Sequence, residues 1–322
     1  MRGVFIACLA CLVSCVLAGC ERSSTREAGP MRVVVTIPPL KGLVEPMLPP
    51  GSEVIVLLPP GRSEHGWEPR QGDLKAIARA DLTVSVGLGL EASFFRVLHK
   101  VRNDRRIDVT FAELVGLEGA GASIEAGKSA GHGHHHDHDH EHDEHCDHSH
   151  DGADPHLWLD PVLCMEFAGK LAPVIERAAR KAGMNESDVV RTAERAGELE
   201  ARIGQLDAEC RRLLEPVRGK AIVTHHAAFG RLADRYGLRV VEVVRPVEGV
   251  EPTTGQISAV LEAIRREGVS AIFAEPQYAD RSVDMIAQRA GVQLGRLDPL
   301  GSGDWFAMMR ANVEELAAKL GP

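Results

Sequence analysis

Short hydrophobic runs alternate with amphipathic stretches along most of the chain. Most of the runs are rich in Val, Ile and Leu and end at polar residues, which is typical of buried strands in a parallel sheet. The predicted strands are Arg32–Ile37, Ser52–Leu58, Leu82–Val86, Ala221–Thr224, Arg239–Val244, Ala271–Ala274 and Gln293–Arg296. The predicted crossover helices are Gln71–Arg79, Ala228–Tyr236, Ile257–Glu267 and Ser282–Ala290. This order predicts an α/β fold of two lobes, each a mostly parallel sheet flanked by helices.

One long, highly charged segment separates the two halves. Ser187–Leu214 is rich in helix formers, with Ser187 as a candidate N-cap and Pro216 as a candidate stop. At 1.5 Å per residue this helix would span roughly 40 Å, more than one lobe needs, so we expect a rigid connector along both lobes. An ordinary long surface helix is the alternative. The predicted division is residues 32–186 for the N-terminal lobe, 187–215 for the connecting helix and 216–322 for the C-terminal lobe.

The N-terminus has the features of an export signal. Val4–Leu17 is apolar apart from Ser14 and is too short for a membrane-spanning helix. The sequence Leu-Ala-Gly before Cys20 resembles a bacterial lipoprotein cleavage box, in which the cysteine becomes the lipidated N-terminus. We therefore expect a signal peptide over residues 1–19, a polar tether over residues 20–31 and an extracytoplasmic protein anchored to a membrane by lipid on Cys20. An ordinary signal peptide with a chance cysteine is the alternative.

Charge and cysteine content narrow the class of protein. The formal net charge is −9, and it becomes −10 when the signal segment with its one arginine is removed, so nucleic acid is not an expected partner. The cysteines outside the signal segment and the lipidation site are Cys146, Cys164 and Cys210. Such an odd and sparse set in an oxidising compartment argues against a fold built on disulfides.

Histidine is concentrated in one low-complexity segment. Of the 15 histidines, ten lie between positions 132 and 150, interleaved with Asp and Glu. They are His132, His134, His135, His136, His138, His140, His142, His145, His148 and His150. Imidazole with carboxylate is a ligand set for Zn²⁺, and a flexible segment would bind several ions weakly because each site must be ordered. We expect loop 116–152 to provide weak metal sites; a solubilising loop without metal is the alternative.

The main site is expected from residues that are far apart in the sequence. His65 follows the second predicted strand, and His226 and Asp298 each come two residues after a later one. His156 lies between prolines that favour an extended or turning backbone. Open α/β sheets bind ligands at the carboxyl ends of their strands, so these four side chains can converge between the lobes as a His₃Asp zinc site. Glu64, next to His65, is a possible fourth ligand.

Two further histidines are not expected to bind metal. His99 lies in a helical pattern beside basic residues, and His225 should point away from its neighbour His226.

A series of motifs occurs in a characteristic order. The motifs are Ser63-Glu64-His65 with Glu68-Pro69 and Asp73, Asp154-Pro155-His156-Leu157-Trp158-Leu159-Asp160-Pro161, His226-Ala227-Ala228-Phe229-Gly230 with Tyr236-Gly237-Leu238, Phe273-Ala274-Glu275-Pro276-Gln277, and Leu297-Asp298-Pro299-Leu300. Together they resemble the metal-specific solute-binding proteins of bacterial ABC importers, in particular the zinc-uptake, ZnuA-like branch. The resemblance covers roughly Val33 to Leu320.

The resemblance implies a fold, a metal site and a partner. It implies two α/β lobes joined by one rigid helix, with His65, His156 and His226 as ligands and Asp298 or Glu64 completing the shell. It also implies delivery of Zn²⁺ to a membrane permease and its ATPase. An imidazole at position 226 favours zinc, because manganese members of the family tend to have a carboxylate there.

Three positions near these motifs leave open how the surroundings of the metal ligands are built. The family often has Asp where this chain has Ala227 and an aromatic residue where it has Arg231. Neither residue is expected to bind the metal directly. The two departures leave open how residues around the ligands adjust the metal-binding properties of those ligands. Glu275 matches a family landmark, and it is either close to the metal or a structural hydrogen-bond acceptor.

We therefore predict a monomeric, non-enzymatic lipoprotein that binds Zn²⁺ with high affinity and delivers it to an ABC importer. One alternative is a zinc-buffering or adhesive lipoprotein without an importer, which would share every residue discussed above. Another is a zinc-dependent hydrolase, although the chain has no His-Glu-x-x-His run and no nucleophile elbow.

Overall fold

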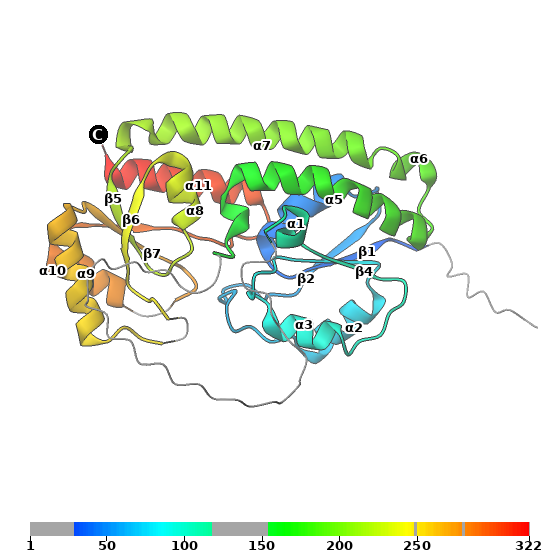
Figure 1. Cartoon of the computed structure of the whole chain (residues 1–322), viewed down its shortest axis with the longest axis horizontal. Helices are drawn as coiled ribbons and strands as arrows, with labels where there is room; N and C mark the ends of the chain where they lie inside the picture. The colour runs from blue at the N-terminus through cyan, green and yellow to red at the C-terminus, as the bar shows by residue number, and fades with distance from the viewer. Residues whose placement is uncertain (1–28, 118–153, 248–249, 279–280, 322) are drawn as a thin grey trace, which may run out of the picture.

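Two four-stranded parallel sheets form the two lobes of the molecule (Figure 1). The computed structural model describes residues 29–117, 154–247, 250–278 and 281–321. The first sheet has the order β2-β1-β3-β4 and the second has the order β6-β5-β7-β8. The strands are β1 Arg32–Val35, β2 Glu53–Val56, β3 Leu82–Ser85, β4 Ile107–Thr110, β5 Ala221–Thr224, β6 Arg239–Val243, β7 Ala271–Ala274 and β8 Gln293–Arg296. The predicted fold class is confirmed.

All seven predicted strands are present, and within the described part of the chain the sequence analysis missed one. Strand β4 pairs in parallel with β3, with Thr83 opposite Asp108 and Ser85 opposite Thr110. It was missed because Asp108 and Thr110 place polar side chains on one of its faces.

Helices connect the strands and cover both sheets. In the first lobe they are α1 Pro38–Val44, the 3₁₀ helix η1 Glu45–Met47, α2 Gln71–Arg79, α3 Ala92–Leu98 and α4 Phe111–Leu114. In the second lobe they are α8 Gly230–Tyr236, α9 Thr254–Glu267, α10 Ser282–Ala290 and α11 Trp305–Leu320. Helix α9 begins before its predicted start at Ile257, because Thr253 and Gln256 form a reciprocal capping box there.

The long helix α7, Thr192–Leu214, extends along both lobes beside α5, Pro161–Ala182, and α11 (Figure 1). Its predicted end at Leu214 is confirmed, and Pro216 lies in the following 3₁₀ turn η3, Glu215–Val217. The predicted N-cap is wrong. Ser187 lies inside a separate short helix, α6 Glu186–Val189, because the Asn185 side chain accepts a hydrogen bond from the Ser187 backbone N–H and caps that helix.

A continuous hydrophobic core joins the two lobes. It includes buried side chains of the first sheet, of α5 and α7, and of the second lobe. Trp158 donates from Nε1 to the Pro299 carbonyl at 2.6 Å, and Trp305 donates from Nε1 to the Trp158 carbonyl at 2.7 Å. Both indoles are fully buried. The turn around Trp158 therefore packs against the second lobe and is hydrogen-bonded to it.

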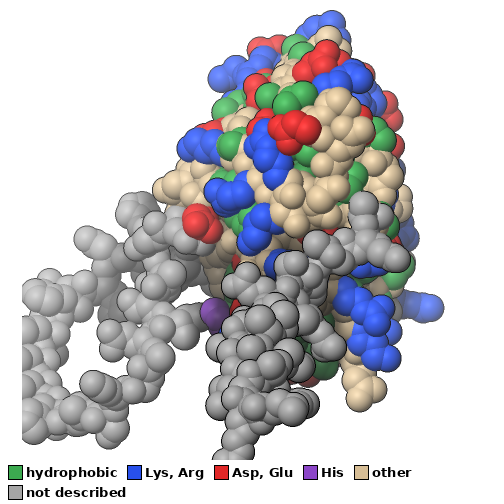
Figure 2. Space-filling view, turned by 90° about the vertical axis from the view of Figure 1, so that its right-hand side faces the viewer, with side chains coloured by type: hydrophobic (Ala, Val, Ile, Leu, Met, Phe, Trp, Pro, Cys, Tyr) green, Lys and Arg blue, Asp and Glu red, His purple; other side chains and the backbone are tan. Residues whose placement is uncertain are grey.

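The visible face of the molecule is mixed in character, and the described cysteines are free thiols. Figure 2 shows acidic and basic side chains mixed over the visible face, with hydrophobic side chains scattered between them. Cys164 and Cys210 are buried free thiols, and Cys146 lies outside the described residues. Among the described helices, none has the length and apolar character needed to cross a membrane.

Candidate metal centre

Three histidines and one glutamate converge from three connections. His65 and Glu64 lie between β2 and α2, His156 directly precedes the 3₁₀ turn η2, Leu157–Leu159, and His226 lies between β5 and α8. One ligand atom from each side chain lies within 4.8 Å of all the others. The imidazole centroids are 5.2 to 5.4 Å apart in all three pairs. Three of the four side chains are buried, and His65 is half-buried.

The distances within this cluster match the size of a zinc ion. His156 Nε2 lies 3.4 Å from His65 Nε2 and 3.3 Å from His226 Nε2. Glu64 Oε1 lies 3.5 Å from His156 Nε2 and 3.6 Å from His226 Nε2. Two ligand atoms that each lie about 2.0–2.1 Å from a tetrahedral zinc ion are about 3.3–3.4 Å apart. Four of the six pairs of ligand atoms therefore have a spacing close to that of a tetrahedral site, and the other two pairs lie within 4.8 Å.

Local hydrogen bonds help to set the backbone at the three histidines. The His65 N–H donates to the Ser63 hydroxyl at 3.2 Å, and Gly66 continues the turn at a φ of +65°, which favours glycine. The His156 N–H donates to Asp154 Oδ1 at 2.9 Å, which forms a turn before η2. The Thr224 hydroxyl donates to the His226 carbonyl at 2.9 Å. Each of the three histidines thus has at least one hydrogen bond between its backbone and a residue two positions before it.

Carboxylates orient two of the imidazoles. His156 Nδ1 lies 2.8 Å from Asp154 Oδ1, and His226 Nδ1 lies 2.6 Å from Glu275 Oε2. Burial alone would raise the pKa of Asp154, but His156 lowers it, so this carboxylate is ionised and only accepts hydrogen bonds; the proton of His156 therefore belongs on Nδ1 and its Nε2 lone pair faces the cluster. The ion pair with Glu275 favours the same tautomer for His226. This is the arrangement by which metal-binding histidines are commonly fixed in one tautomer.

The electrostatics of the cluster favour a cation. Burial alone would raise the pKa of Glu64, but His156 and His226 lower it well below its usual value, so the group stays ionised. Burial would likewise lower the pKa of both histidines; Asp154 and Glu64 raise it for His156, and Glu275 and Glu64 raise it for His226. Among the described residues, no hydrogen bond reaches the buried Glu64 Oε1. A buried anionic oxygen facing three imidazoles is suited to a bound metal ion.

The sequence-predicted fourth ligand Asp298 lies outside this four-residue cluster. Its Oδ1 accepts hydrogen bonds from Gln277 Nε2 at 2.7 Å, from the Leu300 N–H at 2.9 Å and from the Gly301 N–H at 3.0 Å. This oxygen therefore caps the turn that follows β8. Of the two residues proposed as fourth ligand, the structure brings Glu64 to the histidines.

The other sequence-predicted positions lie elsewhere. His225 is buried, and its Nδ1 accepts a hydrogen bond from the Glu275 N–H at 3.3 Å. The ten histidines of the low-complexity segment and Cys20 lie outside the described residues.

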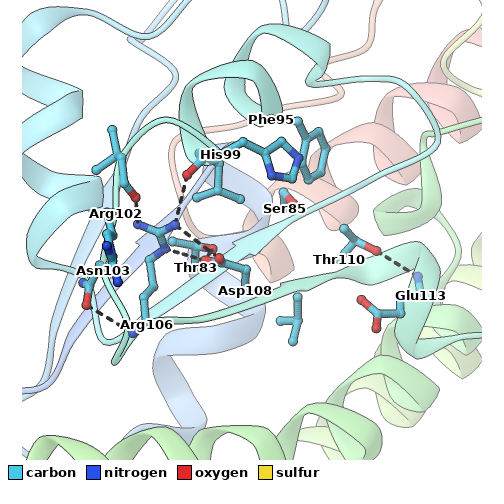
Figure 3. Close-up of a pocket in the computed structure, with 13 residues that line it drawn as sticks. Thr83, Ser85, Phe95, His99, Arg102, Asn103, Arg106, Asp108, Thr110 and Glu113 are labelled. Carbon is cyan, nitrogen blue, oxygen red and sulfur yellow. Dashed lines mark hydrogen bonds and ion pairs between the residues drawn. The ribbon is translucent and has the colours of Figure 1, made fainter. Parts of the chain in front are cut away.

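His99 faces a separate cavity of about 360 Å³ between α3 and the strands β3 and β4 (Figure 3). Arg106 holds one wall of this cavity, donating from Nε to Asp108 at 2.6 Å and from Nη1 and Nη2 to three backbone carbonyls. The cavity contains none of the four clustered residues.

Two functional contacts were missed by sequence reasoning. Asp154 was recognised only as part of a motif, although an Asp two residues before a histidine is a signal for a turn with a side chain–backbone bond. The contact of Glu275 with His226 had no local signal, because the two residues are 49 positions apart.

Comparisons with known proteins show the family of the chain. The family model of the periplasmic zinc-uptake complex component A, ZnuA, matches residues 33–319. The zinc-binding protein AdcA of Streptococcus pyogenes serotype M1 is 27% identical over 301 residues, which cover 89% of this chain. This chain spans 56% of the length of AdcA, little more than half. The high-affinity zinc uptake system protein ZnuA of Haemophilus ducreyi is 28% identical over 274 residues, covering 84% of this chain and 85% of that protein.

A solved structure shares the fold over nearly the whole chain. The periplasmic zinc binding protein TroA of Treponema pallidum has a TM-score of 0.72 at 22% identity, covering 91% of this chain and 100% of that chain. The family match extends over both lobes and confirms the resemblance drawn from the motifs. The chain therefore belongs to the ZnuA family, the periplasmic component A of zinc-uptake complexes.

Proposed function

We propose that this protein binds one Zn²⁺ tightly through His65, His156, His226 and Glu64, outside the cytoplasm, and delivers it to an ABC importer. The observation that carries the proposal is the set of four ligand atoms within 4.8 Å of one another, of which four pairs lie 3.3 to 3.6 Å apart, close to the spacing around a tetrahedral zinc ion. Membership in the zinc-uptake family supports the importer as the partner.

The ligand set favours zinc over metals that prefer oxygen. Three neutral imidazoles and one carboxylate suit a tetrahedral, borderline-soft cation, whereas Mn²⁺ suits more oxygen ligands at a higher coordination number. Asp298, engaged by Gln277 and two backbone N–H groups, adds no second carboxylate to the cluster. The site therefore has the nitrogen-rich composition that zinc accepts readily.

The same geometry favours binding over catalysis. Catalytic zinc sites commonly have three protein ligands and keep a fourth position for water or substrate, whereas four protein ligands close the site. Three of the four side chains are buried. His65 is half-buried and is the most exposed of the four proposed ligands. A site of this kind is suited to capturing a cation and releasing it when one loop moves.

The remaining parts of the proposal concern location and delivery. Periplasmic members define the family, which supports an extracytoplasmic location. Attachment to a membrane through lipid on Cys20, a monomeric state, and transfer of zinc to a permease with its ATPase complete the proposal.

The test is a zinc titration of the full mature chain in competition with a chelator strong enough to suppress weak sites. The wild-type protein should retain one tight ion, and His156→Ala should lose it, because His156 Nε2 is the atom within 3.3 to 3.5 Å of the other three ligands. His99→Ala is the matched control, because His99 lies outside the cluster. Retention of a tight ion by His156→Ala would contradict the proposed site.

Delivery to an importer requires a separate experiment in cells. Deletion of the gene should impair growth only when zinc is limiting, and the wild-type gene should restore growth while a His156→Ala gene should not. Normal zinc accumulation in the deletion strain would instead favour a zinc-buffering or adhesive lipoprotein.

A further inference from the structure

Arg231, the second residue of α8, reaches the turn that carries a ligand from another part of the chain. Its Nη2 donates to the Asp154 carbonyl at 2.7 Å and its Nε donates to the same oxygen at 3.1 Å. Nε also lies 3.6 Å from Asp154 Oδ2. One guanidinium therefore holds both the backbone and the side chain of a residue 77 positions away.

Asp154 in turn holds His156. Its Oδ1 accepts from the His156 N–H at 2.9 Å and faces His156 Nδ1 at 2.8 Å, while its Oδ2 faces Arg231. The two carboxylate oxygens are thus divided between the ligand and the guanidinium. A movement of Asp154 would change both the backbone and the ring orientation of His156.

His156 has the central place in the cluster. Its Nε2 lies 3.4 Å from His65 Nε2, 3.3 Å from His226 Nε2 and 3.5 Å from Glu64 Oε1. A small rotation of this ring would change three ligand spacings at once. The geometry of the site therefore depends on how firmly the turn from Asp154 to His156 is held.

Hydrogen bonds hold the turn on both sides of His156. After it, Trp158 is buried and bonded to the Pro299 carbonyl. Before it, Arg231 holds the turn from the first turn of α8, which directly follows the connection that supplies His226. The segment from His226 to Arg231 thus provides one ligand directly and orients a second one through Arg231.

We propose that Arg231 is a positioning residue that holds Asp154, and through it His156, in the metal-binding geometry and so slows the release of zinc. The inference rests on the proposed zinc-binding function. The bonds to the Asp154 carbonyl are charge-assisted and converge on one oxygen, unlike a mobile surface ion pair.

The experiment measures zinc dissociation from the full mature chain by stopped flow with excess chelator. Arg231→Met should release zinc about 10-fold faster, the lower end of the range for residues that support a metal ligand, because Arg231 acts through Asp154. Arg231→Lys should restore only part of the effect, since an ammonium group lacks the guanidinium fork. With Co²⁺ as the bound ion, the visible spectrum of Arg231→Met should also change, because it reports the ligand geometry.

Arg239→Met is the matched control. Arg239 lies on β6 and is exposed, and its guanidinium pairs with Glu267 and not with Asp154. Its loss should leave both the dissociation rate and the Co²⁺ spectrum unchanged. Thermal unfolding of the metal-free variants separates an effect on the site from an effect on the fold.

A double-mutant cycle with Asp154→Ala tests the route of the effect. If Arg231 acts through Asp154, the two substitutions should be strongly non-additive in the dissociation rate. Additive effects, or a dissociation rate for Arg231→Met within twofold of wild type, would overturn the inference while leaving the proposed function intact. Absence of any tight zinc site in the wild-type protein would remove the proposed function and the inference with it.

Discussion

Replacing Glu275 with Gln should weaken zinc binding, because it should favour the tautomer of His226 that has its proton on Nε2, the atom expected to bind the metal. Glu275 is 2% exposed; its Oε1 accepts from the His226 N–H at 3.0 Å and its Oε2 lies 2.6 Å from His226 Nδ1. Glutamine has only one oxygen acceptor. If that oxygen keeps the backbone N–H, the amide nitrogen faces Nδ1 and favours the tautomer with the proton on Nε2, the atom that faces the cluster.

The expected loss of zinc affinity follows from the free-energy cost of reversing this tautomer preference of His226. Metal-free Glu275→Gln satisfies its hydrogen bonds with the proton on Nε2, but zinc binding requires the proton on Nδ1, opposite the amide N–H. A buried donor left without an acceptor costs about 1–3 kcal/mol, which corresponds to about a 5- to 150-fold loss of affinity. The usual effect of removing such an outer partner is about 10- to 100-fold, so we expect a loss of about 30-fold.

The assay is a competition titration with a chelator of known zinc affinity, with circular dichroism to verify the fold. The control is Glu267→Gln, which loses contacts with Arg239 and Arg266 on the far end of α9 and should leave zinc affinity unchanged. If Glu275→Gln is folded and its zinc affinity stays within twofold of wild type, then Glu275 does not govern the tautomer of His226.

Three further predictions concern pH, specificity and the low-complexity segment. Nearby carboxylates outweigh burial and raise the pKa of His156 and His226 above the usual value of about 6.5, so protons should compete with zinc already above that pH. Zinc affinity measured by chelator competition should fall steadily from pH 8 to pH 5, and a flat profile would exclude a histidine-dominated site. His226→Glu should lower zinc affinity and narrow the gap between Zn²⁺ and Mn²⁺ in metal competition, because it replaces a nitrogen ligand with oxygen; an unchanged ratio would remove His226 from the ligand set. Deleting residues 131–150 should leave one tight zinc ion per chain by titration, and loss of that ion would mean that the segment contributes to the main site.

The amino-acid sequence alone determined the fold class and three members of the cluster. Buried parallel strands carry a strong local signal, because both faces must be apolar, and all seven predicted strands are present. The loops at their carboxyl ends then pointed to His65 and His226, and the proline-flanked motif pointed to His156. Strand β4 escaped because Asp108 and Thr110 place polar side chains on one of its faces.

Only the tertiary structure decided which carboxylate joins the histidines. Glu64 and Asp298 both follow predicted strands, and nothing local ranks one above the other. In the second sheet β7 separates β8 from β5, so Asp298 starts two strand spacings, about 10 Å, from the strand that carries His226. Asp298 is also engaged by Gln277 and by the backbone of its own turn.

The same is true of the residues that hold the ligands in place. Arg231 meets Asp154 across 77 positions, and Glu275 meets His226 across 49. Such contacts depend on strand order and on how the two lobes pack, because a hydrogen bond forms only when both groups are brought within about 3 Å. Local hydrophobic patterns specify each strand and helix separately, whereas these distances are set by all of them together.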